Sequence, residues 1–292
     1  MNPRRIERPT TIPEALSLLK LDNAQPMAGG TDLMIGRRRA PFDADEIWVA
    51  LGRLDGLRNI RHEKGRWHIG PLVTHAELAG HAELQREAAF LPQAASLVGS
   101  PQIRAQGTVG GNIANAASCA DTVPPLIALG AEITLESAEQ KRTLALADFF
   151  LAPYKTVRKR NELITDISFP DLPQSPRTRG PTSRTAFLKL GRRQALAISR
   201  LSVAVFVSGN DVLDDVRISV GSVLPRFGRL HEAEEMLKGF PPASDRFREA
   251  GRAGSAEAVR IAGRRWSTDY KEPVLAALIS RALCNACGIS WQ

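Results

Sequence analysis

The chain has 292 residues, of which 43% are hydrophobic and 24% are charged, and its net charge is +8. The length predicts about two domains, and the composition excludes collagen, a long coiled coil and a disordered chain. No apolar run approaches the roughly 20 residues of a membrane-spanning helix, and the N-terminus lacks the apolar core of a signal peptide. We therefore expect a cytoplasmic protein with no membrane span.

Basic residues gather in one part of the chain. Between Leu151 and Arg200 there are eleven basic residues and three acidic ones. Such a segment favours nucleic acid, a nucleotide cofactor or an acidic protein partner, although many charge runs are only a solvated surface. A nucleic-acid-binding module is a rival function because the isoelectric point is near 9.9. The segment has few aromatic residues on which single strands could stack, so we expect no nucleic-acid partner.

The sequence of the first 80 residues predicts a mixture of helices and strands. Thr11 to Glu14 has the spacing of a capping box with proline in the first turn, so a short helix should begin there. A strand at Gln25 to Ala28 should run into a glycine turn and then a helix from Leu33 to Arg38. The further expected features are strands at Glu46–Ala50 and Arg66–Gly70 and a second capping box at Thr74–Glu77.

The middle of the chain holds its longest segment of low charge. From Gly107 to Ala131 the only charged side chain is that of Asp121, so the segment is either core or backbone that faces a ligand. The flanking expected elements are helices at Phe90–Val98 and Ala147–Phe150 and strands at Glu132–Leu135 and Leu163–Phe169.

A proline-rich stretch divides the chain. Four prolines fall between Pro170 and Arg184, which is typical of a linker or long loop. We place the domain boundary near Pro176, giving domains of residues 1–176 and 177–292. The second domain should contain strands at 186–190, 201–208 and 216–223, followed by helices at 229–238, 245–260 and 273–287. Strands followed by helices predict an α+β layer.

Two glycine motifs have the composition of anion-binding backbone: Ala28-Gly29-Gly30-Thr31-Asp32 and Thr108-Val109-Gly110-Gly111-Asn112-Ile113-Ala114-Asn115. Paired glycines let successive N–H groups converge on phosphate oxygens, and Thr and Asn add side-chain donors. Each motif taken alone is also compatible with an ordinary turn. Neither has the Rossmann spacing, and the chain has no P-loop sequence.

Cysteine and histidine give little indication of a metal site. The three cysteines are too few for a disulfide scaffold, and Cys284 and Cys287 continue an apolar helical stripe. Helix packing is the favoured role for this pair, with redox or metal chemistry as the alternative. His62, His68, His75, His81 and His231 have no ligand spacing, so surface or core roles are expected. We expect no metal site and no catalytic side chain.

The two glycine motifs, together with Asn161–Pro170 and Phe187–Ser199, resemble the FAD-binding subunit of the xanthine dehydrogenase type of molybdenum hydroxylase. The resemblance covers most of the chain in the same order. It implies an α+β fold: a vanillyl-alcohol-oxidase-like FAD-binding domain of two subdomains, split near residue 57, followed by a smaller α+β C-terminal domain. Thr31-Asp32 stands where the carbon monoxide dehydrogenase branch typically has His-Ser, which favours the xanthine dehydrogenase-like branch.

The resemblance also implies how FAD is held. One side of the pyrophosphate would meet Ala28, Gly29, Gly30, Thr31, Asp32 and Leu33, and the other would meet Thr108, Gly110, Gly111, Asn112 and Asn115. Asp121 would contact the polar edge of the flavin, with Ile164 against the ring and Lys189 near it. The alternatives are a helix N-cap for Asp121, strand core for Ile164 and a solvated strand position for Lys189.

The function implied by the resemblance is electron transfer. FAD would take electrons from [2Fe–2S] clusters on a small partner subunit, while a large subunit carries the molybdenum cofactor, and would pass them to NAD⁺ or another acceptor. Two such clusters need eight protein ligands, so the three cysteines here place them on another chain. The alternative is a flavin-free scaffold subunit, because Val98 and Ala197 depart from the family's pattern near the flavin. We assign the basic segment partly to subunit docking.

Overall fold

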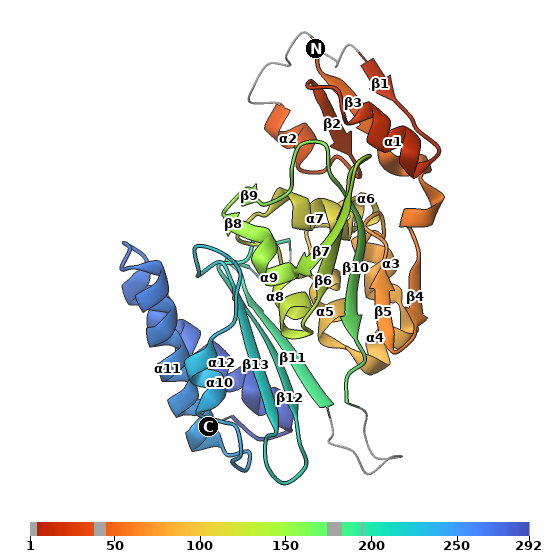
Figure 1. Ribbon diagram of the computed structural model, residues 1–292. Coiled ribbons are helices and arrows are strands. Elements are labelled where there is room, and N and C mark those ends of the chain that lie inside the picture. The colour runs from red at the N-terminus through yellow and green to blue at the C-terminus, as the bar shows by residue number, and fades with distance from the viewer. Residues whose placement is uncertain (1–4, 38–44, 174–182, 194–195, 292) are drawn as a thin grey trace. The chain divides into compact units, whose positions relative to one another are not determined.

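The computed structural model describes residues 5–37, 45–173, 183–193 and 196–291, and within it the chain forms two compact units (Figure 1). The first unit comprises residues 1–78, 100–117 and 131–170, and the second comprises 79–99, 118–130 and 171–292. The boundary expected near Pro176 lies outside the described residues. The expected split near residue 57 stays a prediction.

The first unit begins with a small parallel sheet. Its strand order is β1-β3-β2, with bounds Arg5–Glu7, Ile47–Ala50 and Ala24–Met27. Helix α1 (Ile12–Leu18) buries Ala15 and Leu16 in the core cluster that includes Val49 of β3. As predicted, Thr11 caps this helix, and its hydroxyl accepts a hydrogen bond from the Glu14 amide.

An antiparallel sheet forms the rest of the first unit's framework. Its strand order is β4-β5-β10-β6-β7, and β10 (Leu163–Pro170) pairs with β5 on one side and β6 on the other. The other bounds are β4 Ile60–Glu63, β5 Arg66–Ile69, β6 Glu132–Glu136 and β7 Lys141–Ala145. The remaining elements of this unit are α2 Leu33–Arg37, η1 Leu51–Arg53, η2 Asp55–Leu57, α6 Pro101–Gln106, α7 Val109–Asn115, α9 Leu146–Phe149, β8 Phe150–Ala152 and β9 Lys155–Thr156. Helix α3 spans His75–Gly80, and the unit boundary falls within it.

The second unit is built on the antiparallel sheet β11-β12-β13. The central strand β12 (Leu201–Ser208) is buried along its whole length. Its Leu201, Val203, Val205 and Val207 share a core with the long helices α11 (Ser244–Ala262) and α12 (Thr268–Cys287), which lie beside the sheet in Figure 1. The other elements are α4 Ala82–Glu87, α5 Phe90–Ser96, α8 Val123–Ala128, β11 Ser183–Leu190, β13 Asp215–Gly221 and α10 His231–Glu235.

The expected α+β organisation is confirmed, with every predicted strand and helix found within a few residues of its position. The prediction for the second glycine motif was incomplete, because residues 109–115 form helix α7 rather than a loop. Cys284 packs in the core on α12, as expected of a small apolar side chain. Among the described residues, no helix has the length and apolar character needed to cross a bilayer.

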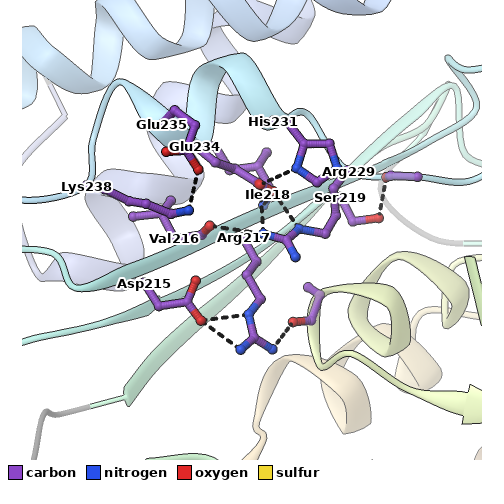
Figure 2. A network of polar contacts seen from close by, with 12 residues as sticks. Asp215, Val216, Arg217, Ile218, Ser219, Arg229, His231, Glu234, Glu235 and Lys238 are labelled. Atoms are coloured by element: carbon purple, nitrogen blue, oxygen red, sulfur yellow. Dashed lines mark hydrogen bonds and ion pairs between the residues drawn. The ribbon is translucent and has the colours of Figure 1, made fainter. Parts of the chain in front are cut away.

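A buried carboxylate fastens α10 to the sheet of the second unit. Glu234 is fully buried and accepts hydrogen bonds from the Ile218 amide at 2.7 Å and from Arg229 Nε and Nη2 at 2.8 and 2.7 Å (Figure 2). His231 Nδ1 lies 3.1 Å from the same carboxylate. Because a buried charge is stable only when it is paired and hydrogen-bonded, this network fixes the register between α10 and β13.

Replacing Glu234 by alanine should lower the free energy of unfolding by about 3 kcal/mol, because Arg229 and the Ile218 amide lose their buried acceptor. The neighbouring Glu235 is exposed and pairs with Lys238 at the surface, so Glu235→Ala should cost less than about 1 kcal/mol. Urea denaturation followed by circular dichroism measures both values. Equal losses in the two variants would contradict the role of Glu234.

Candidate functional site

The first glycine motif forms the turn between β2 and α2. Gly30 has φ +70°, a backbone conformation that favours glycine. The N–H groups from Gly29 to Leu33 have no hydrogen-bond acceptor among the described residues. Successive unpaired N–H groups in a turn that leads into a helix attract anions, so this motif has the chemistry that the sequence predicted for it.

The second motif uses its N–H groups differently. Thr108 is the N-cap of α7, and its hydroxyl accepts from the Gly111 amide at 3.1 Å. The amides of Val109 and Gly110 donate to the carbonyl groups of Val73 and Pro71, each at 2.9 Å. The expectation that these N–H groups converge on phosphate is therefore wrong for Val109, Gly110 and Gly111. At this motif the glycines allow the start of α7 to pack closely against neighbouring residues.

The two motifs lie against each other within the first unit. A Cβ atom on Gly29 would stand 1.9 Å from the Gln106 carbonyl oxygen and 3.2 Å from Gly107 Cα. A Cβ on Gly111 would approach Thr108 Oγ1 at 2.8 Å and Ala28 Cβ at 3.9 Å. Gly29 is thus required because the backbone of Gln106, just before the second motif, occupies the space of a side chain, whereas at Gly111 the obstacle is the Thr108 hydroxyl of its own motif. The structure therefore brings Ala28 and Gly29 of the first motif close to Gly111 and to the segment that precedes the second motif.

His75 lies at the same junction. Its amide donates to the Gly107 carbonyl at 3.0 Å, and a Cβ on Gly107 would meet the imidazole at 3.3 Å and Thr31 Oγ1 at 3.4 Å. The side chain is buried, and its Nδ1 has no partner among the described residues. Burial, with a smaller effect of the Arg104 charge, lowers the pKa of His75 to about 4. The ring is therefore neutral at pH 7.

From the sequence we expected a surface or core role for all five histidines, and nothing distinguished His75 from the others. Its position inside the Thr74–Glu77 capping box was the one available signal. The structure confirms this capping box. The Glu77 amide donates to Thr74 Oγ1 at 3.2 Å, and the Thr74 amide donates to Glu77 Oε2 at 2.8 Å. This reciprocal pair holds the start of α3 beside the glycine motifs.

Asp121 and Lys189 form a buried ion pair in the second unit. Lys189 Nζ lies 2.6 Å from Asp121 Oδ2 and donates also to the Leu97 carbonyl at 2.8 Å, while Ser199 donates to Asp121 Oδ1. Burial raises the pKa of Asp121, and the Lys189 and Ser199 contacts oppose that rise. Asp121 is not a helix N-cap, because Thr122 has that position in α8. Lys189 is not solvated either, since its side chain is 10% exposed.

Ile164 is buried in β10 opposite Leu135 of β6. The pairing register shifts between Ile164 and Asp166. Such bulges bend a strand and re-aim its side chains, and they often occur beside functional sites. Ile164 belongs to the first unit with both glycine motifs, whereas Asp121 and Lys189 belong to the second.

The chain is similar in sequence to known protein families. Residues 2–172 match the model for the FAD binding domain in molybdopterin dehydrogenase, and residues 186–286 match that for the CO dehydrogenase flavoprotein C-terminal domain. The chain belongs to this family. It is an FAD-binding medium subunit of the molybdenum hydroxylases, and its cofactor is FAD.

Individual relatives match nearly the whole chain. The nicotine 6-hydroxylase medium subunit of Paenarthrobacter nicotinovorans is 26% identical over 97% of this chain and 96% of its own. The nicotinate dehydrogenase FAD-subunit of Eubacterium barkeri is 34% identical, with 80% of this chain and 79% of that protein covered. A chain of carbon monoxide dehydrogenase from Hydrogenophaga pseudoflava has 28% identity and a TM-score of 0.87, covering 99% of both chains. The predicted fold class is thereby confirmed.

Gly29→Ala should weaken FAD binding at least ~10-fold, because a Cβ cannot coexist with the Gln106 carbonyl and the two motifs must separate. Gly36→Ala is the matched control: it lies in α2, four residues past the end of the motif at Asp32, and a Cβ there meets no atom of the described residues within 4 Å. The measurement is FAD released per folded chain, with folding checked by circular dichroism. Normal FAD content in Gly29→Ala would contradict this packing.

Folding should depend on pH through His75. The pKa of His75 is lowered by folding, so the unfolded chain binds a proton that the folded chain excludes between pH 6.5 and about 4. This group therefore removes about 3 kcal/mol of stability as pH falls through that window. His75→Leu should lose that part of the pH dependence, whereas His62→Leu, at an exposed position, should retain it. Denaturation curves at pH 6.5 and 4.5 for the three proteins compare these slopes, and identical slopes would contradict the assignment.

Proposed function

We propose that the pyrophosphate of FAD binds where the two glycine motifs meet. Ala28, Gly29, Gly30, Thr31, Asp32 and Leu33 would hold it from one side, chiefly through backbone N–H groups. Thr108, Gly110, Gly111, Asn112 and Asn115 would shape the other side, with the two asparagines as side-chain donors. The observation that carries this proposal is the run of N–H groups from Gly29 to Leu33, beside the α7 N-terminus, that have no acceptor in the described part of the chain. Hydrogen bonds from N–H groups to a charged phosphate belong to the stronger class.

The flavin end of the cofactor is assigned to Asp121, Ile164 and Lys189. The carboxylate of Asp121 would accept from the polar edge of the flavin and ribityl chain, and Lys189 would hold that carboxylate in its ionised form. Ile164 would present an apolar surface to the ring. No side chain of this site is required to act as nucleophile or general base, because the cofactor supplies the chemistry and the protein binds and orients it.

The activity that follows is electron transfer within a larger enzyme. Bound FAD can accept electrons one at a time and release them as a pair. The proposed donor is a small subunit with [2Fe–2S] clusters, and a large subunit would carry the molybdenum cofactor. The proposed acceptor is NAD⁺ or another oxidant. Support comes from relatives named as medium or FAD subunits of a hydroxylase and of dehydrogenases and from the three cysteines, which cannot ligate two clusters.

A spectroscopic experiment tests this function directly. The chain is co-expressed with its cluster-bearing subunit, and the purified complex should show the absorption of oxidised flavin and release about one FAD per chain. Reduction of the clusters should bleach the flavin bands, and added NAD⁺ should restore them while NADH forms. Restoration by oxygen or a quinone but not by NAD⁺ would change the proposed acceptor. A chain that stays colourless with added FAD would instead support the flavin-free scaffold.

A further inference from the structure

A short hairpin of the first unit presents large apolar side chains to solvent. Strands β8 and β9 are joined by Pro153 and Tyr154 and pair between Phe150 and Thr156. Leu151 is 58% exposed and Tyr154 is 70% exposed. The hairpin is anchored from below, because Phe149 and Phe150 are buried and meet edge to face with ring centroids 5.3 Å apart. The exposed side chains of Leu151 and Tyr154 are therefore attached to a backbone that buried aromatic residues hold in place.

The hairpin holds Tyr154 in a costly backbone conformation. Its φ is +61° and it follows proline, a pattern typical of a type II turn, in which glycine is preferred at this position. The Tyr154 amide donates at 2.9 Å to the carbonyl of Ala116, the C-cap of α7, which itself has φ +51°. Strained residues are concentrated at functional sites, although they also occur elsewhere. This one is fastened to the helix that carries the second glycine motif.

The segment that follows the hairpin is also rigid. Glu162 is fully buried and accepts from Arg142 Nε and Nη2 and from the Lys159 amide at 2.7 to 2.9 Å. Although burial opposes its ionisation, these hydrogen bonds hold the pKa of Glu162 below its usual value. Arg158 donates inward to the carbonyl groups of Lys159, Arg160 and Glu162. Arg158 thus shapes the segment and is not one of its outward charges.

The outward charges are all positive. Lys155, Lys159 and Arg160 are exposed, and no carboxylate occurs between Phe150 and Asn161. Leu151, Tyr154, Lys155, Lys159 and Arg160 together form what we call the hairpin surface. Exposed apolar side chains close in sequence to exposed charges are a combination typical of protein interfaces. A preorganised surface of this kind loses little conformational entropy on binding.

We propose that the hairpin surface docks the subunit that donates electrons to the flavin, through an apolar recess on that subunit rimmed by carboxylates. The proposal rests on the proposed electron-transfer function. The donor, rather than another subunit, is chosen because the hairpin is bonded to the end of α7, and α7 contacts β10, the strand whose Ile164 we place against the flavin ring that receives the electrons.

The test compares the assembly of the full-length chain with its partner subunits in the wild type and in two variants. Tyr154→Gly removes the aromatic ring and relieves the strained φ, so the chain should fold at least as well as before. It should weaken binding to the cluster-bearing subunit at least ~10-fold. The triple variant Lys155→Glu, Lys159→Glu and Arg160→Glu should weaken assembly most at low salt, because opposed charges are screened as ionic strength rises. Lys64→Glu, in the β4–β5 turn with φ +51°, is the control and should assemble normally.

Binding of each chain to the separate cluster-bearing subunit and to the separate molybdenum subunit is measured by titration over a salt series, with FAD content recorded in parallel. Docking is supported if affinity for the cluster-bearing subunit falls while FAD content stays that of the wild type. Wild-type affinity in both variants overturns the proposal, as does a loss confined to the molybdenum subunit. Lost FAD in Tyr154→Gly also overturns it, because the hairpin would then only support α7. A different result would refute the electron-transfer function alone: the wild-type chain contains no FAD, but its assembly still depends on the hairpin surface. The hairpin surface would then remain a docking site.

Discussion

The site depends on one close approach between backbone segments. The Gln106 carbonyl lies where a Cβ of residue 29 would be, so only glycine allows the first motif to reach the second. Because this contact fixes the turn from Gly29 to Leu33 against the end of α6, the N–H groups of the turn, which have no acceptor in the described part of the chain, are held in a defined arrangement. Preorganised donors of this kind need little rearrangement when an anion binds, and that is the physical basis of a strong phosphate site.

The same constraint explains why two similar motifs have different roles. In the first motif the glycines leave N–H groups available, and in the second they allow α7 to sit against Pro71, whose Cβ is 2.4 Å from the place of a Gly110 Cβ. The N–H groups at the start of α7 are used by Pro71, Val73 and Thr108. Donors for a cofactor on that side must therefore come chiefly from side chains. Composition alone cannot distinguish a glycine that opens space for a ligand from one that admits another part of the chain.

The sequence predicted most of the fold because its signals were local. Capping boxes at Thr11 and Thr74, the apolar run of β12 and the apolar stripe on α12 each depend on neighbours within a few positions. Helix α7 was missed since two glycines disfavour a helix by about 1 kcal/mol each, and only tertiary packing restores it. The burial of His75 beside Gly107 and the pairing of Asp121 with Lys189 both depend on residues that are far apart in the chain. No local pattern carries such contacts.

Charge gives the clearest case of information that only the structure supplies. The basic segment from Leu151 to Arg200 reads as one run of positive residues, yet its members have different partners. Lys189 pairs with Asp121, Arg158 turns inward to three carbonyl groups, and Arg184 donates to the Gly209 carbonyl. These charges maintain the fold, so they are not available to a partner. The exposed charges of the hairpin surface, Lys155, Lys159 and Arg160, instead lie close in sequence to the exposed side chains of Leu151 and Tyr154. A long basic stripe would suit a polyanion, whereas a short group of charges combined with exposed apolar side chains suits a protein surface.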